Sequence, residues 1–425
     1  MPLSRDPEAA SNRQDRHLPS SQQPSSAVCE PASASATDPR YIVLLALLLG
    51  AQPVATDLYL PALPALKAEL GNPALTLTAM MLAFGLAQIV WGPISDRHGR
   101  KPVLIGGALG YTLASLVGAL APNMTLLVIA RIVQGIAMAA LIVCARATVR
   151  DLYAPVEGMR VLSKGLTGLG FIALASPLVG AAVATLTPWR GSLVAIGVFG
   201  LVALAWIALY YRESLSEAAR VQARAAPKGA LRKVLSGPKF RAWTALATAS
   251  YCTLFGFLLG SSFVYMNVFG FSALGCGLVL AANCVAYIAG TWYCRWLLAR
   301  HAPDRSVRIA SLWSVGGGLA VLIVSLLWQP HPAVMIVGQC LFSIGHGVNQ
   351  PCSQAGAIGD YPEHAGRAAS LSGAAMMIGA FLTGQAMAPF LGASAWPLIV
   401  SNALGGVMVF AIAWTVVPRA YRQAP

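Results

Sequence analysis

Twelve long runs of apolar residues are the feature of this 425-residue sequence that most restricts its fold. An α-helix needs about 20 mostly apolar residues to cross a bilayer, because each residue advances it by about 1.5 Å. Polar and apolar residues do not alternate within these runs, as they would in the strands of an outer-membrane barrel. We therefore predict membrane-spanning helices at roughly 41–63, 75–93, 102–121, 124–145, 165–186, 190–211, 245–268, 273–294, 309–328, 333–355, 369–391 and 396–417.

Charged residues are scarce in the chain as a whole. They make up 10% of the chain, whereas soluble domains carry about 25%. Lys and Arg outnumber Asp and Glu by 29 to 15, which gives a formal net charge of +14. A nucleic-acid-binding protein would gather its basic residues on a polar domain, but here they lie in short groups between apolar runs. The composition therefore favours an integral membrane protein and argues against a nucleic-acid partner.

The basic groups predict the orientation of the chain. If the N-terminus lies inside, 26 of the 29 basic residues fall on the inner side, in the tail, the inner loops and the basic central segment. The outer side keeps only Lys67 and Arg190, and Arg131 falls within a helix. Cytoplasmic loops of membrane proteins collect Lys and Arg. We therefore predict a multi-pass protein of the cell inner membrane with both termini in the cytoplasm.

The longest inner connection, residues 212–241, divides the chain into two six-helix halves, 41–211 and 242–425, the second ending in a short cytoplasmic tail. Residues 1–40 are rich in Ser, Ala, Pro and Gln, and we expect a disordered cytoplasmic tail there. Two six-helix halves joined by a basic loop are typical of transporters built from parallel repeats. The predicted fold class is an all-α integral membrane protein with twelve transmembrane helices in two six-helix pseudo-repeats.

Motifs of nucleotide, metal and hydrolase chemistry are missing from the sequence. We find no Walker loop, dinucleotide fingerprint, metal-ligand cluster or G-x-S-x-G. The eight cysteines form no C-x-x-C and lie mostly within predicted helices, where they serve as small apolar packing residues. We therefore expect no cofactor and no metal, and any pumping must draw on an ion gradient.

The connection after the second run carries the most specific motif, G-P-I-S-D-R-H-G-R-K at residues 92–101. Its glycines allow a tight turn between antiparallel helices. The spacing resembles the signature loop of the major facilitator superfamily, which lies between helices 2 and 3 of that fold. The resemblance implies that Asp96 stabilises the outward-facing state by facing the start of helix 11, near residues 369–372, where a helix dipole favours an acidic group. It marks these residues as a conformational gate: Gly92, Asp96, Arg97, Gly99, Arg100 and Lys101.

Three further stretches narrow the resemblance. They are T-D-L-Y-L-P-A-L-P at 56–64, R-I-V-Q-G at 131–135 and P-E-H-A-G-R-A-A-S at 362–370. Together they resemble the Bcr/CflA group of drug:proton antiporters, which includes bicyclomycin and chloramphenicol-type exporters, over about residues 40–417. The predicted fifth helix carries Gly168, Pro177 and Gly180, a loose match to the helix-5 motif of antiporters. Close packing of helices is an equally good interpretation of these small residues.

Ionisable side chains inside a bilayer are costly, so they are candidates for a functional site by default. Only Asp57 and Arg131 lie well inside predicted helices. The helical rise places them roughly 9 Å and roughly 12 Å below the outer ends of their helices, so a direct or water-mediated pairing is within reach. Desolvation would favour a neutral Asp57 and Arg131 would favour its ionised form, which predicts a proton-coupling pair. In the alternative interpretation, Asp57 is a hydrated cap beyond a helix that ends near residue 55, and Arg131 extends outward to water.

Other polar residues lie in helices that would line a central cavity. Aromatic and amide groups in a largely apolar cavity suit amphipathic compounds. For each residue a hydrogen bond between helices is the competing interpretation, and we interpret His346 as structural first. The candidates are Gln52, Tyr59, Gln134, Tyr251, Tyr265, Asn267, His346, Asn349 and Gln350.

These observations predict a secondary active transporter. We expect it to export small amphipathic drugs or metabolites in exchange for protons, by rocking its two halves around a midplane site. One alternative is a proton-coupled uptake symporter on the same fold. A membrane-embedded enzyme is the remote alternative, because it would need converging carboxylates, a metal cluster or a nucleophile–base pair. We expect a monomer whose partners are the substrate, protons and the lipid bilayer.

Overall fold

The computed structural model describes residues 39–153, 155–217, 221, 231–361 and 365–422. Within these residues every regular element is a helix. This follows from the solvent, because a backbone that crosses lipid must satisfy its hydrogen bonds internally and a helix does so within one segment. The predicted tail up to residue 38, most of the predicted central linker and the P-E-H part of the 362–370 stretch lie outside the described residues.

The first half of the chain forms α1 to α7. The bounds are α1 Pro39–Asp57, η1 Leu60–Ala62, α2 Leu63–Leu70, α3 Ala74–His98, α4 Arg100–Ala119, α5 Met124–Leu152, α6 Pro155–Leu186 and α7 Trp189–Tyr210. The short η1 and α2 continue the line of α1, so this first apolar run is one long segment with a break after Asp57.

The second half begins after the short helix α9, Leu231–Ser236. Its bounds are α10 Pro238–Ser262, η2 Phe263–Val268, α11 Ala273–Leu298, α12 Pro303–Leu327, α13 Pro332–Gly359, α14 Ala365–Met387, η4 Ala388–Phe390, α15 Trp396–Ala411, η5 Ile412–Val416 and α16 Val417–Arg422. Each half therefore places six long helical segments where six apolar runs were predicted.

Eleven of these segments, among the described residues, are long and apolar enough to cross a membrane. The one remaining run, the tenth (333–355), corresponds to α13, which has 28 residues but a less apolar composition. Buried polar residues such as Gln339, His346 and Asn349 lower its hydropathy. Those residues bond within their own half, as described below, so α13 can keep a polar face inside the bundle.

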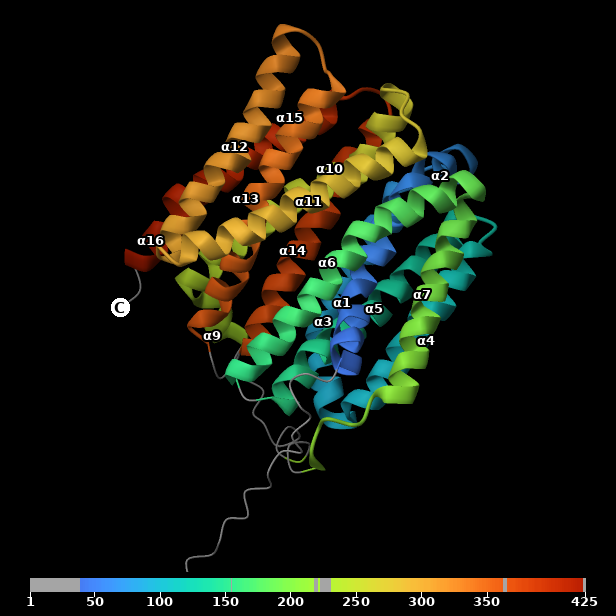
Figure 1. Ribbon diagram of the computed structural model, residues 1–425, viewed down its shortest axis with the longest axis vertical. Helices are drawn as coiled ribbons and strands as arrows, with labels where there is room; N and C mark the ends of the chain where they lie inside the picture. The colour runs from blue at the N-terminus through green and yellow to red at the C-terminus, as the bar shows by residue number, and fades with distance from the viewer. Residues whose placement is uncertain (1–38, 154, 218–220, 222–230, 362–364, 423–425) are drawn as a thin grey trace, which may run out of the picture.

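Two groups of helices are visible in Figure 1, α1–α7 in blue to green and α10–α16 in yellow to red. The halves meet where α3 packs against α14 and where α6 packs against α11. Glycines permit this close approach: any side chain at Gly85 of α3 would overlap Met377 of α14. We call the end of the bundle that carries the connection between α7 and α9 the linker end, and the other end the opposite end. The turns from α3 to α4 and from α13 to α14 also lie at the linker end.

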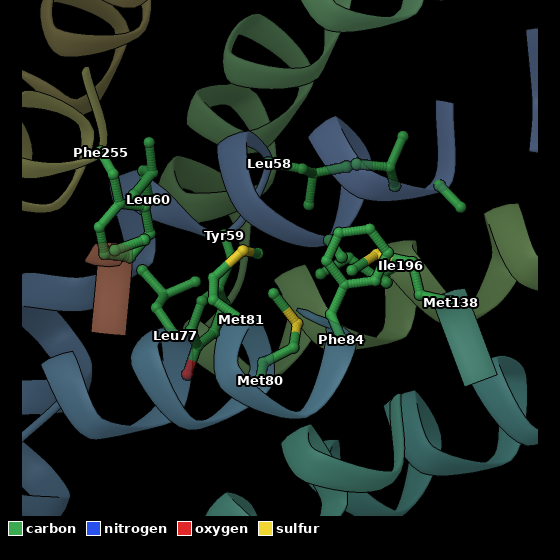
Figure 2. Close-up of a cluster of buried hydrophobic side chains, with 14 of the residues drawn as sticks. Leu58, Tyr59, Leu60, Leu77, Met80, Met81, Phe84, Met138, Ile196 and Phe255 are labelled. Atoms are coloured by element: carbon green, nitrogen blue, oxygen red, sulfur yellow. The ribbon is translucent and has the colours of Figure 1, made fainter. Parts of the chain in front are cut away.

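The core of the first half forms where α1 and η1 cross α3. Figure 2 shows Met80, Met81 and Phe84 of α3 facing Leu58 and Leu60, and all five are at most 5% exposed. Lipid tails are as apolar as these side chains, so the hydrophobic effect does not by itself hold such helices together. Close van der Waals contact between many atoms does, and it fixes the end of α1 where Asp57 lies.

Candidate functional site

A cavity of about 130 Å³ lies between the two halves, on the side of the linker end. The first half contributes side chains of α1, α3 and α5, and the second contributes side chains of α10, α13 and α14. Its lining residues are Gln52, Phe84, Gln88, Ile142, Arg146, Tyr251, Gln350, Gln354, Ile358, Ala369, Ser372, Gly373, Met376 and Met377. Residues 369–373 belong to the first turns of α14, which begin at the linker end.

Contacts between the halves close the opposite end. The Lys67 ammonium of α2 donates a hydrogen bond to the carbonyl oxygen of Leu391 at 2.5 Å and lies over the ring of Phe263. Nearer the middle, the amide of Gln385 on α14 donates to the hydroxyl of Thr78 on α3 at 3.0 Å. The cavity is therefore separated from the opposite end by direct contacts, which defines a state that faces the linker end.

Three of the predicted cavity residues line this cavity. The Gln52 amide donates to the Tyr251 hydroxyl at 3.0 Å, which joins α1 of one half to α10 of the other. Gln350 of α13 lies on the same wall, and its amide nitrogen is 3.6 Å from the sulfur of Met376. The structure thus brings Gln52, Tyr251 and Gln350 to one cavity.

The remaining candidates of the first half, Tyr59 and Gln134, do not line it. Gln134 is fully buried and donates to the Ser115 hydroxyl of α4 at 2.6 Å. Tyr59 is also fully buried, and its ring lies under the guanidinium of Arg131. Both side chains pack inside their own half, where hydrogen bonding and packing outweigh access to the cavity.

Four candidates of the second half also lie away from the cavity. His346 accepts or donates a 2.8 Å hydrogen bond with the Ser250 hydroxyl and lies between aromatic rings. Asn349 is buried with its amide 3.5 Å from Ser314, and Tyr265 packs against Phe269 and Phe271. Asn267 is exposed at the opposite end. The interpretation of His346 as structural agrees with this arrangement.

Asp57 is the last residue of α1 and is 9% exposed. Its carboxylate accepts a 2.8 Å hydrogen bond from Thr56, and no basic side chain pairs with it among the described residues. It lies within electrostatic range of Tyr251 and Cys284, on α10 and α11 of the other half. Asp57 is therefore a buried acid next to the interface between the halves, and the alternative of a hydrated cap does not describe it.

Arg131 is 1% exposed, so it does not extend outward to water. Its guanidinium donates to the carbonyl oxygen of Ala55 at 2.8 Å and to the side chain of Gln134, and it lies 4.6 Å from the centre of the Tyr59 ring. The direct Asp57–Arg131 pairing that we considered is not formed here. The reason is direction: Arg131 contacts the backbone of α1 from inside the first half, whereas Asp57 is near the second half.

The gate motif forms a network at the linker end. The Arg100 guanidinium lies 2.6 Å from the Asp96 carboxylate and donates to Asp151 of α5 at 2.9 Å. The backbone N–H groups of Arg100 and Lys101 donate to the carboxylate of Glu213, at 2.9 Å and 3.1 Å. An acidic group is favoured at these first turns of α4 by the helix dipole. Arg97 and Gly92 lie at the surface, outside this buried part.

The ion-pair partners of Asp96 are Arg100 and, at 4.0 Å, Arg150, both in its own half. The resemblance implied that Asp96 faces the start of α14 in the outward-facing state, and that role stays a prediction. Here Arg150 lies toward α14, because a side chain added at Gly366 would be 3.7 Å from its guanidinium. A nearby guanidinium is a stronger partner for a carboxylate than a helix dipole. In this state the network therefore holds the first half together at its linker end.

The helix-5 glycines and proline lie in α6, between α1 and α11. Any side chain at Gly168 would press on Ala46 of α1, and one at Gly180 would overlap the carbonyl of Leu58. Pro177 presents its carbonyl to Gly277 of α11 across the interface between the halves. These residues let α6 pack closely on both sides, next to the turn that carries Asp57.

The cavity also contains residues that the sequence did not single out. The polar ones are Gln88, Gln354 and Ser372, which were not among the cavity candidates, and Arg146, which was assigned to an inner loop. The prediction ended the fourth run at residue 145, but α5 continues to Leu152 and carries Arg146 on its cavity side. Charges mark the end of an apolar run, but they do not end a helix, since Arg is a good helix former.

Two bundles of membrane-length helices around a cavity, closed at one end by contacts between the bundles, are the arrangement of a membrane transporter. The family model of the Major Facilitator Superfamily matches residues 45–384. The chain belongs to this superfamily, and it is accordingly a transporter and not an enzyme.

Known relatives confirm the resemblance to the Bcr/CflA group. The multidrug resistance protein D of Escherichia coli is 26% identical over 349 residues, covering 80% of this chain and 86% of the relative. The bicyclomycin resistance protein homolog of Haemophilus influenzae is 25% identical, covering 88% and 94%. A chloramphenicol resistance protein of Pseudomonas aeruginosa is 39% identical over 158 residues, which is 35% of this chain and 38% of the relative.

Solved structures confirm the fold. The crystal structure of a D-xylose-proton symporter superposes with a TM-score of 0.69, at 13% sequence identity, covering 91% of this chain and 99% of the other. At that identity the likeness concerns the arrangement of the helices and not the transported compound. It shows that the helices of this chain are arranged as in that structure.

Proposed function

We propose that this protein exports small amphipathic compounds from the cytoplasm across the inner membrane, in exchange for protons. The relatives named for multidrug, bicyclomycin and chloramphenicol resistance support the direction and the class of substrate. The distribution of basic residues supports a cytoplasmic linker end, because most basic residues of the described part of the chain lie in the turns and helix ends there. Substrate would then enter the cavity from the cytoplasm in the state described here.

The burial of the Asp57 carboxylate is the observation that best supports the proposed coupling of export to protons. It has a hydroxyl partner in Thr56, no basic partner among the described residues, and a position beside the interface that must open and close. Desolvation and nearby dipoles decide whether such a group holds a proton, and both change when the halves move apart. Asp57 would take a proton from the outside in one state and release it to the cytoplasm in the other.

Arg131 contributes to this cycle by position. Its bonds to the Ala55 carbonyl and to Gln134 fix the last turn of α1. The Gln52–Tyr251 bond, just over one turn before Asp57, joins that turn to the second half. Substrate that occupies the cavity beside Gln52 and Tyr251 would disturb this bond. That gives a physical route from substrate binding to the environment of the Asp57 carboxylate.

The test is substrate-induced proton release by purified protein. Replacing Asp57 by Asn removes the titratable group and keeps the shape, so proton release on adding chloramphenicol should fall to the level of protein-free buffer. Replacing Asp304 by Asn is the matched control, because Asp304 is paired with Arg308 on the surface of α12. We expect that variant to release protons as the unchanged protein does.

Transport in everted vesicles separates export from uptake. Export predicts that a proton gradient, acidic inside the vesicle, drives chloramphenicol into everted vesicles. Accumulation only in right-side-out vesicles would instead favour the uptake symporter. Proton-driven export that survives in Asp57→Asn with an unchanged pH dependence would rule out the proposed role of Asp57.

A further inference from the structure

Arg146 is a cation in the cavity that has no partner among the described residues. Its side chain is exposed to the cavity, and it makes no hydrogen bond or ion pair with any described residue. Other basic residues at the linker end differ in this respect: Arg100 and Arg150 lie beside Asp96 and Asp151, and Lys239 lies beside Asp360. An unpaired guanidinium that faces a partly enclosed space is an incomplete site.

Two residues of the second half that line the same cavity carry unpartnered polar groups. The side-chain oxygen of Gln350 and the hydroxyl of Ser372 are buried, and neither has a hydrogen-bond partner. Both residues line the same cavity as Arg146, on α13 and α14. Buried polar atoms are almost always hydrogen-bonded, so these two atoms have unused bonding capacity that a ligand would meet once the side chains turn into the cavity. Ser372 can donate to an anionic oxygen, and the Gln350 oxygen can accept from a ligand O–H or N–H.

The lining also has an apolar wall, and its described residues carry no carboxylate. Phe84, Ile142, Met376 and Met377 provide an apolar wall, and methionine side chains adapt to ligands of different shape. No Asp or Glu is among the lining residues within the described part of the chain. The charge of the cavity is therefore positive, which disfavours cations and attracts anions.

We propose that Arg146 selects the substrate: the cavity binds amphipathic organic anions. The guanidinium would bind a carboxylate or phosphate group in a bidentate manner, as arginine geometry favours. Ser372 would add a hydrogen bond to the same group, and Gln350 would accept one from a hydroxyl or amide of the ligand. Because Arg146 belongs to one half and the other two residues to the other, the ligand would join the halves. Binding of the anion does not depend on the proposed function. Only the statement that this ligand is the transported compound rests on it.

The experiment compares two isosteric probes, 3-hydroxy-2-naphthoate and the neutral 3-hydroxy-2-naphthamide. Their equilibrium binding to the purified full-length protein is measured in detergent, which requires no proton gradient. We expect the naphthoate to bind about tenfold more tightly than the naphthamide. Arg146→Gln should weaken naphthoate binding by about tenfold and leave naphthamide binding within about twofold. Arg146→Lys keeps the charge and should retain part of the preference.

Arg295→Gln is the matched control, because Arg295 lies near the end of α11, outside the cavity, and the change removes the same charge. It should leave both affinities unchanged. Equal binding of the two probes, absence of naphthoate binding, or an unaltered preference in Arg146→Gln would each overturn the proposal. If Arg146→Gln does not fold, equal binding of the probes by a folded Arg146→Lys would overturn it. Failure of the Asp57→Asn transport test would leave this binding result intact, so the two proposals fail separately.

Discussion

At the scale of single residues, the structure places Asp57 and Arg131 in different surroundings, although the sequence predicted that they form one proton-coupling pair. Depth in the membrane follows from counting helical rise, and the burial of Asp57 and Arg131 was predicted in this way. The direction of a side chain around its helix depends on which helices are neighbours, and a sequence without aligned relatives does not supply this. The pairing was therefore not predictable. The contact between Arg131 and the backbone of α1 is visible only in the packed structure.

Arg131 should therefore act through the stability of the first half. Replacing it by Met removes a charged donor from the Ala55 carbonyl and from Gln134, which we expect to cost about 2 kcal/mol. Thermal unfolding in detergent measures the loss as a lower Tm. Arg300→Met is the control, since Arg300 is exposed and lies over Trp296 on the surface. A Tm of Arg131→Met equal to that of the control would contradict this anchoring role.

At the scale of elements, the apolar runs located all of the long helices, but their ends were less well defined. The run containing α5 was ended just before Arg146, and this moved Arg146 from a cavity to a loop. The run containing α3 was also ended early, at residue 93, whereas the helix continues to His98. There a single residue, Gly99, separates α3 from α4. Its φ of 100° lies where side chains are disfavoured, so the glycine of the motif is required by geometry.

Gly99→Ala should strain this turn and displace Arg100 from Asp96 and Asp151. We expect a loss of about 1–2 kcal/mol in stability, together with reduced transport. Gly106→Ala on α4 provides the comparison, because a side chain there meets nothing within 4 Å and its φ is not positive. Thermal unfolding and vesicle transport of the two variants measure the difference. Equal behaviour of both variants would show that the turn tolerates a side chain.

At the scale of the whole molecule, the two-half architecture followed from the number of runs and the position of the basic loop. The conformational state of the molecule did not follow, because the same sequence adopts every state of the transport cycle. The structure adds that the opposite end is closed by the bond from Lys67 to Leu391. Lys67 was one of only two basic residues predicted outside, and the structure shows that it joins the halves.

Lys67→Ala should therefore favour states open at the opposite end. Spin labels at the exposed positions Leu120 and Trp328, one on each half, in a background without native cysteines, would report the separation. We expect longer distances in Lys67→Ala. Arg190→Ala is the control, because Arg190 bonds to Glu69 and Ala121 within the first half. An equal shift in both variants, or none in Lys67→Ala, would count against a role for Lys67 in closure.

The unpaired Arg146 has a consequence for the energy source of the cycle. An exported anion carries negative charge outward while a proton carries positive charge inward, so both steps move charge in the same sense. With one of each per cycle, a membrane potential of 100 mV, negative inside, would contribute about 2.3 kcal/mol for each of the two charges. Export would then continue when the external pH equals the internal pH, and it would stop when a potassium ionophore collapses the potential.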